Sequence, residues 1–404
     1  MPFQIALSGL NAASSDLNVT ANNIANVNTT GFKSSRAEFA DMFPISAYGL
    51  ASTATGIGTR TARVAQQMSQ GNINTTGNTL DLAISGEGFF TLSNNGSLAY
   101  SRAGAFGTDE NGYVVNASGM RLQVFPATSS GTFDTSQLSD LQLSTTTNAP
   151  RATTTVNANV NLPSSDDVPA TTTFDANDPT SYNDTRSVTV YDSLGTAHQA
   201  AMYFVKGSTA NSWDVHVQVD GSDVGGGSVT YSDSGELLTP SNGQLSLGAY
   251  TPSNGAAAMN LSFDLSDSTQ YGDTFSLNSL TQDGYTTGSL TTVEVTDGGI
   301  VQARYSNGQA TPLGQIALTR FPNAQGLQQL GDSTWGETYD AGQPIRGAAD
   351  SPNFGGVQSG ALEGSNVDLT AQLVNMITAQ RNFQANAQMI STADQITQTI
   401  INIR

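Results

Sequence analysis

The chain of 404 residues contains no cysteine, only two lysines and two histidines, and 12% charged residues, against about 25% in an ordinary soluble protein. The absence of cysteine excludes disulfides, thiol catalysis and thiolate metal sites. Fourteen Lys and Arg stand against 33 Asp and Glu, which gives a net charge of −19. Because a nucleic-acid binder needs clustered basic side chains, we expect no nucleic-acid partner.

Long apolar runs are also lacking, and no segment approaches the ~18 consecutive apolar residues of a membrane span. The first fifteen residues carry no Lys or Arg and their apolar stretch is interrupted by polar residues, which is not the pattern of a cleaved secretory signal. The only histidines are His198 and His216, the latter expected on the solvent side of a strand, and no H-E-x-x-H or G-x-S-x-G motif exists. We therefore expect no enzyme and no catalytic, cofactor or metal site.

What the chain does contain is an apolar seam near each end. At the N-terminus, seven positions from 3 to 24 step by 4, 3, 4, 3, 4, 3, and all except Ser14 are apolar. This spacing is typical of a helix that packs against a partner helix in a coiled coil. The residues of this seam are Phe3, Leu7, Leu10, Leu17, Ala21 and Ile24.

The C-terminal stretch repeats the pattern over a longer span, with a phase slip between Ile390 and Ile396. Ser365 to Asp368 resembles a capping box, which predicts Asp368 in the first turn of a helix. The residues of this second seam are Leu369, Leu373, Met376, Phe383, Ala387, Ile390, Ile396, Ile400 and Ile403.

The two predicted helices carry very few charges. Between positions 1 and 32 the only charged residue is Asp16, and from position 367 to 404 there are four. The two helices pairing with each other is the simplest interpretation of the seams. Since a solvated helix normally carries many charges, their neutral outer faces favour additional burial between subunits.

The sequence between the two predicted helices indicates strands joined by hairpin turns. Trp213, Val215, Val217 and Val219 alternate with polar residues, as in a half-buried strand. Strands do not alternate with helices, so we predict a mostly β, multidomain protein with nested antiparallel β domains and terminal α-helices.

Composition shifts suggest the boundaries of these domains. A Thr-rich stretch near 147 and a matching return near 284 predict that the outer β domain is inserted into a loop of the inner one. We expect a terminal helical domain at 1–32 and 358–404, a connector at 33–70, an inner β domain at 71–146 and 285–357, and the outer domain at 147–284.

Several motifs resemble those of the flagellar rod and hook family of bacteria. The stretch from Ala21 to Lys33, which contains Asn22, Asn23, Ile24, Ala25, Asn26, Gly31, Phe32 and Lys33, is similar to the N-terminal signature of that family. The stretches 80–90, 361–369 and 376–386 resemble its core and C-terminal motifs. The resemblance covers essentially the whole chain, and the large inserted domain favours a hook subunit over a rod subunit.

The resemblance implies a structural polymer and not an enzyme. Copies of the chain would assemble into a curved, bendable hollow tube outside the cell, with the terminal helices innermost, transmitting motor torque and passing exported subunits. Implied partners are the distal rod, the hook cap, the hook–filament junction proteins and the flagellar type III export apparatus, reached without a cleaved signal peptide.

Two other interpretations stay open. One is a distal rod subunit, which would form a straight tube. The other is an acidic extracellular β protein that binds glycans or surfaces through residues 147–284, with Trp213 and Tyr203 either as contacts or as core residues.

Overall fold

The computed structural model describes residues 2–43, 56–128, 131–143 and 147–402. The chain divides into two compact units. Unit 1 comprises Met1–Ser144, Thr292–Arg304 and Ala310–Arg404, and unit 2 comprises Thr145–Thr291 and Tyr305–Gln309. Unit 2 is thus an insertion within unit 1, as the nested-domain prediction requires.

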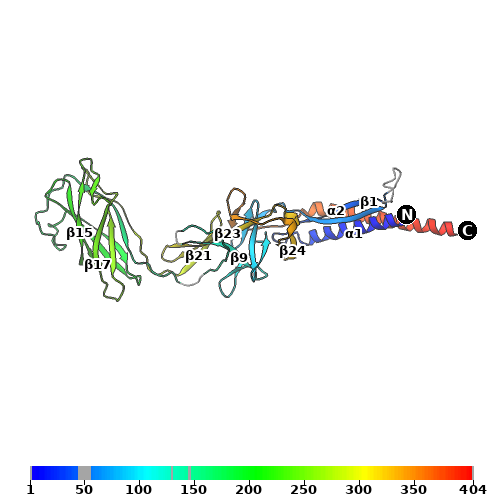
Figure 1. Cartoon of the computed structure of the whole chain (residues 1–404), viewed down its shortest axis with the longest axis horizontal. Coiled ribbons are helices and arrows are strands. Elements are labelled where there is room, and N and C mark those ends of the chain that lie inside the picture. The colour runs from blue at the N-terminus through cyan, green and yellow to red at the C-terminus, as the bar shows by residue number, and fades with distance from the viewer. Residues whose placement is uncertain (1, 44–55, 129–130, 144–146, 403–404) are drawn as a thin grey trace. The chain divides into compact units, whose positions relative to one another are not determined.

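The two helices of unit 1 lie side by side and run antiparallel (Figure 1). They are α1 (Pro2–Ala25) and α2 (Leu369–Asn402). Asn23 near the end of α1 donates a hydrogen bond of 3.3 Å to Gln372 in the first turn of α2. Near the start of α1, Gly9 faces Asn386, because a Cβ there would lie 2.5 Å from the Asn386 side-chain oxygen. The predicted pairing of the terminal helices is confirmed.

The start of α2 differs from the predicted capping box. Asp368 itself is the N-cap, since its carboxylate accepts hydrogen bonds from the backbone N–H groups of Thr370 and Ala371 at 2.9 and 3.1 Å. Ser365 instead accepts a hydrogen bond from the N–H of Val367. The helix begins later than predicted because the intervening Asn366 is held outside it by other contacts, described below.

A β-hairpin occupies the region that the composition presents as a connector. Strands β1 (Ser35–Met42) and β2 (Gly58–Gln66) pair antiparallel and pack on α1. The Ser8 hydroxyl of α1 accepts a hydrogen bond of 3.2 Å from the Thr59 N–H of β2. The hairpin therefore covers part of α1.

The β body of unit 1 is built on one 12-stranded sheet in the described part of the chain. Its strands are β5 (Phe89–Asn94), β6 (Ser97–Ser101), β7 (Gly107–Thr108), β8 (Val114–Val115), β9 (Arg121–Pro126), β10 (Ser139–Asp140), β21 (Leu290–Val295), β22 (Ile300–Tyr305), β23 (Ala310–Arg320), β24 (Gln328–Gly331), β25 (Thr334–Gly336) and β26 (Ile345–Ala348). Phe90, Leu92 and Leu122 are fully buried at its centre.

Smaller elements connect this sheet to the helices. They are the pairs β3 (Ile73–Thr75) with β28 (Ala361–Glu363) and β4 (Leu82–Ser85) with β27 (Gly356–Ser359), and the 3₁₀ turns η1 (Ala324–Gly326) and η2 (Tyr339–Ala341). Since β27 and β28 directly precede α2, the start of that helix is fixed to the β body of unit 1.

Unit 2 contains two five-stranded sheets within the described residues. One holds β11 (Thr155–Pro163), β17 (Gln244–Tyr250), β18 (Met259–Asp264), β19 (Thr269–Tyr271) and β20 (Ser276–Gln282). The other holds β12 (Asp184–Tyr191), β13 (Ala197–Lys206), β14 (Ser212–Val219), β15 (Ser222–Tyr231) and β16 (Leu237–Thr239). One core joins both sheets, with Phe204, Trp213 and Phe263 completely buried.

The alternation predicted for β14 is confirmed, because its four apolar residues are buried and the residues between them are only partly covered. Trp213 is a core residue and offers no surface for a glycan. Tyr203 is half-buried against Phe174 and Tyr182. His216 lies on the face of β14 opposite the core, as predicted, where it is half-buried and stacks on Phe174 with ring centroids 4.1 Å apart.

Candidate assembly surface

The N-terminal seam is only partly covered within the chain. Phe3 is 51% exposed and Leu7 42%. Ala21 is also exposed, while Leu10, Leu17 and Ile24 are half-buried. The side chains that α1 buries most completely are Ala6, Ala13, Thr20 and Asn23, on a neighbouring stripe.

The C-terminal seam is more exposed. Leu369, Leu373, Phe383 and Ile396 are exposed, and Met376, Ala387 and Ile390 are half-buried. The side chain of Ile400 and all of Ile403 lie outside the described residues. In α2 the only fully buried apolar side chain in the described part is the small Ala379.

The seam prediction missed further apolar side chains on these helices. Val374, Ile377 and Met389 are about half exposed, and Ile5 and Ile401 are exposed as well. Val374 and Ile377 are three residues apart, which places them on one helical face. A count of every apolar position, and not only those at heptad spacing, could have found this second face.

The exposed apolar side chains of α1 and α2 together form a surface. The two helices contact each other through small or polar side chains and leave their large apolar side chains at the surface. Contiguous apolar surface of this kind marks an interaction site on a soluble protein. We call the exposed apolar side chains of α1 and α2 the assembly surface.

The Asn-rich motif at the end of α1 fixes the helix to the hairpin. The Asn23 side chain donates to the Ser35 carbonyl at 2.8 Å and accepts from the Ser35 N–H at 2.9 Å. Asn23 is buried, so both bonds form away from water. An amide suits this position, because its NH₂ group and its oxygen pair with the carbonyl and the N–H of the same backbone residue.

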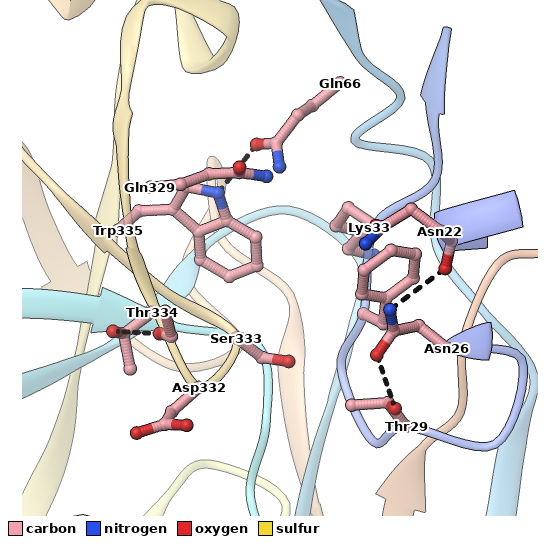
Figure 2. A pocket seen from close by; sticks show the side chains of 12 residues that line it. Asn22, Asn26, Thr29, Lys33, Gln66, Gln329, Asp332, Ser333, Thr334 and Trp335 are labelled. Carbon is pink, nitrogen blue, oxygen red and sulfur yellow. Dashed lines mark hydrogen bonds between the residues drawn. The ribbon is translucent and has the colours of Figure 1, made fainter. Parts of the chain in front are cut away.

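The residues after Asn23 form the turn that ends the helix (Figure 2). Asn26 donates to the Asn22 carbonyl at 2.9 Å and accepts from the Thr29 hydroxyl at 3.0 Å. Ile24 and Phe32 are half-buried and Ala25 is exposed. Gly31 has φ +68, and a Cβ there would lie 2.4 Å from the backbone nitrogen of Ala103. Glycine is therefore required at this close approach.

A cavity of about 310 Å³ lies beside this turn (Figure 2). Figure 2 shows Asn22 and Asn26 on one side of it and Thr334 and Trp335 on the other, and Phe32 also lines it. The Trp335 indole donates a hydrogen bond of 2.7 Å to the Gln66 side chain. No group of three or more His, Asp or Glu in the described part of the chain is placed to hold a metal ion.

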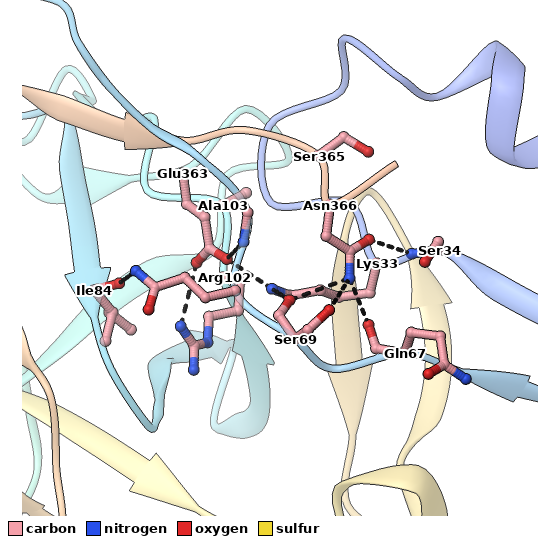
Figure 3. Close-up of polar contacts among 12 residues, drawn as sticks. Lys33, Ser34, Gln67, Ser69, Ile84, Arg102, Ala103, Glu363, Ser365 and Asn366 are labelled. Carbon is pink, nitrogen blue, oxygen red and sulfur yellow. Dashed lines mark hydrogen bonds and ion pairs between the residues drawn. The ribbon is translucent and has the colours of Figure 1, made fainter. Parts of the chain in front are cut away.

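A buried ionic cluster joins the motif to the β body (Figure 3). Lys33 Nζ lies 2.6 Å from one oxygen of Glu363, and Arg102 lies 3.2 Å from the other. The three side chains are 1%, 0% and 5% exposed for Lys33, Glu363 and Arg102. Burial lowers the pKa of Lys33, and the neighbouring Glu363 carboxylate opposes that shift.

Further hydrogen bonds complete this cluster. Lys33 donates to the Ser69 carbonyl at 2.7 Å and Arg102 donates to the Gly86 carbonyl at 2.8 Å. The family motif places Lys33 in the sequence, but the partners Arg102 and Glu363 come from distant segments. The single Glu363 carboxylate thus pairs with two cations, and these contacts join three parts of the chain.

Asn366 makes the contacts that hold it outside α2 (Figure 3). Its side chain accepts from the Ser34 N–H at 2.7 Å and donates to the Gln67 carbonyl at 2.7 Å and to Ser69 at 3.0–3.1 Å. Together, Asn23, Lys33, Glu363 and Asn366 tie the ends of both helices to the β body. We call these four residues and Arg102 the polar joint.

The chain matches family profiles in four stretches. These are the flagella basal body rod protein over residues 3–33, the flagellar hook protein FlgE/F/G D1 domain over 83–176, the flagellar basal body protein FlaE D2 domain over 159–285, and the flagellar basal body rod FlgEFG protein C-terminal region over 358–403. None of the described helices is long and apolar enough to cross a membrane.

Full-length relatives carry a single name. The flagellar hook protein FlgE of Escherichia coli (strain K12) is 43% identical over 100% of both chains, and that of Borreliella burgdorferi is 32% identical over 98% of both. The crystal structure of Helicobacter pylori flagellar hook protein FlgE2 has a TM-score of 0.55, covers 72% of this chain and 100% of that chain, and is 15% identical, so it supports the fold alone.

The relatives and the solved structure agree with a mostly β fold that has a helix at each end of the chain. The relatives and the matched regions support the hook interpretation over both the distal rod and the glycan-binding alternative. The chain belongs to the flagellar hook protein FlgE family.

Proposed function

We propose that this chain is the structural subunit of a bacterial flagellar hook and polymerises with copies of itself into a curved, bendable hollow tube. The tube transmits motor torque to the filament and passes exported subunits. Its terminal segments, 1–32 and 358–404, form the inner tube, and the β domains form the outer layers. The proposal contains no catalytic step.

The observation that carries the proposal is the exposure of the assembly surface. A helix pair that leaves Phe3, Leu373 and Ile396 41–55% exposed has not buried its apolar surface. Full burial of an exposed side chain of this size gains roughly 1.5–3 kcal/mol, and about half of that gain is still to be made here. Packing against other copies of the same helices supplies that burial.

The neutral polar residues of these helices suit the same role. Asn, Gln, Ser and Thr occupy most of the positions between the seams, and a channel lined with them holds little fixed charge to retain a passing polypeptide. We further propose that the chain leaves the cell through the flagellar type III apparatus without a cleaved signal. In the flagellum, the partners that the assembled chain contacts are the distal rod, the hook cap and the hook–filament junction proteins.

Seam substitutions in a bacterium lacking its own hook protein test the proposal. Leu373→Asn and Ile396→Asn should each lower the number of hooks per cell at least tenfold, because each removes an apolar contact between copies. Leu238→Asn in unit 2 is the matched control, since Leu238 is 57% exposed, and it should leave hook number unchanged. Equal effects at all three positions would contradict the proposal.

A further inference from the structure

Charged side chains are rare on the two terminal helices. Within α1 and α2 they are Asp16, Arg381 and Asp394. Asp394 accepts a hydrogen bond of 3.1 Å from Gln398, one turn along the same helix. Within the described residues, Asp16 and Arg381 form neither an ion pair nor a side-chain hydrogen bond. The helices therefore hold one acid and one base without partners.

Asp16 lies on the side of α1 that meets α2, but it is only half-buried there, so part of the residue stays accessible from outside the chain. It is seven residues from both Gly9 and Asn23, which face Asn386 and Gln372. Positions seven apart share a helical face, so the residue opposite Asp16 is Ala379, midway between those two. Ala379 is completely buried and offers only a methyl group. Partial burial raises the pKa of Asp16, because the carboxylate is desolvated without a compensating charge.

Arg381 lies at nearly the same level of the helix pair but on another face. It is two residues from Ala379, and so about 200° around α2 from the residue that meets α1. It shares its face with Val374 and Ile377, which are 59% and 48% exposed. Arg381 therefore points away from the Asp16 of its own chain and into the assembly surface.

Burial of this surface creates an electrostatic requirement. Packing Val374 and Ile377 against another copy removes water from Arg381 as well, and a buried charge without a partner is strongly unfavourable. Asp368 caps α2 and Asp394 is already hydrogen-bonded within its own helix. Asp16 is the unpartnered acid among the described helical residues, and the described part of its own chain offers it no base.

We propose that, in the assembled polymer, Arg381 of one copy forms a salt bridge with Asp16 of a neighbouring copy. This pairing rests on the proposed function, because it needs a second copy of the chain. Apolar seams alone would let neighbouring helices shift along each other by one turn. The salt bridge fixes their alignment, because it forms only when the two charges lie at the same level.

Cross-linking of the full chain tests the pairing directly, because the absence of cysteine allows thiols to be placed only where they are wanted. In assembled hooks carrying Asp16→Cys and Arg381→Cys together, a short bismaleimide should yield a ladder of covalent multiples of the 41.9 kDa chain. Each single-cysteine variant, and the Arg381→Cys/Asp394→Cys pair, should give no ladder. A product confined to single chains, or a ladder from the Asp394 pair alone, would overturn the proposal.

Charge reversal supplies an independent measurement. Asp16→Arg and Arg381→Asp should each lower the number of hooks per cell at least tenfold, and co-expression of the two variants should restore assembly to within about threefold of the unmodified chain. Rescue by mixing requires contact between copies. A mixture no better than either variant would overturn the pairing, whereas failure of the unmodified chain to form hooks would overturn the proposed function itself.

Discussion

The terminal helices and unit 2 use apolar residues in opposite ways. Unit 2 closes a core of its own, in which Phe204, Trp213 and Phe263 are completely buried. The helices bury small side chains such as Ala13 and Ala379 and leave their large ones at the surface. Unit 2 is therefore complete as a single copy, whereas the helices have apolar surface that a single copy cannot cover.

The polar joint differs from both regions, because it is mostly buried within one chain, as the core of unit 2 is, but consists of polar and charged side chains. Its hydrogen bonds and ion pairs all lie within one chain, so it holds the ends of the helices on the β body before any second copy arrives. This difference separates residues that stabilise the monomer from residues that stabilise the polymer. The following substitutions are ordered by their expected effect on the monomer.

The largest effect is expected in the core of unit 2. Phe263→Ala should lower the free energy of unfolding of unit 2 by about 3–5 kcal/mol, because it removes a fully buried ring and leaves a cavity. Denaturant unfolding followed by tryptophan fluorescence measures the change. A loss below about 1 kcal/mol would show that unit 2 does not depend on this core.

A slightly smaller loss is expected at the polar joint. Glu363→Gln should destabilise unit 1 by about 3 kcal/mol, because Lys33 and Arg102 stay buried and lose their counter-charge. Glu38→Gln is the control, since Glu38 pairs with Arg36 and Arg63 at the surface, where solvent screens the ion pairs, and it should change stability far less. Similar losses for the two variants, measured by denaturant titration, would contradict the role of the joint.

Unit 2 should also depend on pH through His198. Burial disfavours the charged imidazole, but hydrogen bonds to Asp220 at 2.6 Å and Asp192 at 3.3 Å outweigh it and raise the pKa of His198. The hydrogen bonds of charged His198 therefore make their full contribution to the stability of unit 2 below the ordinary histidine pKa of about 6.5. This contribution is lost as pH rises through the raised pKa of His198. Urea midpoints should fall over that range, and His198→Gln should remove most of the slope. An unchanged slope in this variant would assign the pH dependence elsewhere.

The smallest monomer effect is expected in the seam. Phe383 is 38% exposed, so Phe383→Ala should lower the stability of the single chain by only about 1–2 kcal/mol, less than a fully buried ring would cost. The same substitution should lower hook number at least tenfold, because the lost contact lies between copies. Electron microscopy of complemented cells measures the effect on hook number, and denaturant unfolding of the monomer measures the effect on stability. A loss of monomer stability as large as that of Phe263→Ala would contradict the assignment of Phe383 to contacts between copies.

Much of the fold could be predicted from the sequence because its signals are local. Heptad spacing predicts both helices, and the alternation from Trp213 to Val219 predicts β14 and its buried face. Charge scarcity on the helices indicates burial beyond one chain. These patterns depend only on which residues lie three, four or two positions apart.

The polar joint could not be predicted in the same way. Glu363 lies 330 positions from Lys33, so no spacing rule connects them. The start of α2 was predicted too early because Asn366 is engaged by Ser34 and Gln67, which are far away in the sequence. The spacing places His216 on the outer face of β14 but does not predict its partial cover, because the Phe174 ring that stacks on it belongs to another segment.

Amide hydrogen exchange of the full chain, as purified monomer and as assembled hook, tests the central claim most directly. If the large apolar side chains of α1 and α2 find their partners only among other copies, amides in 3–24 and 369–399 should exchange rapidly in the monomer and slowly in the hook. Unit 2 should be equally protected in both. Strong protection of the terminal helices in the isolated monomer would contradict the account.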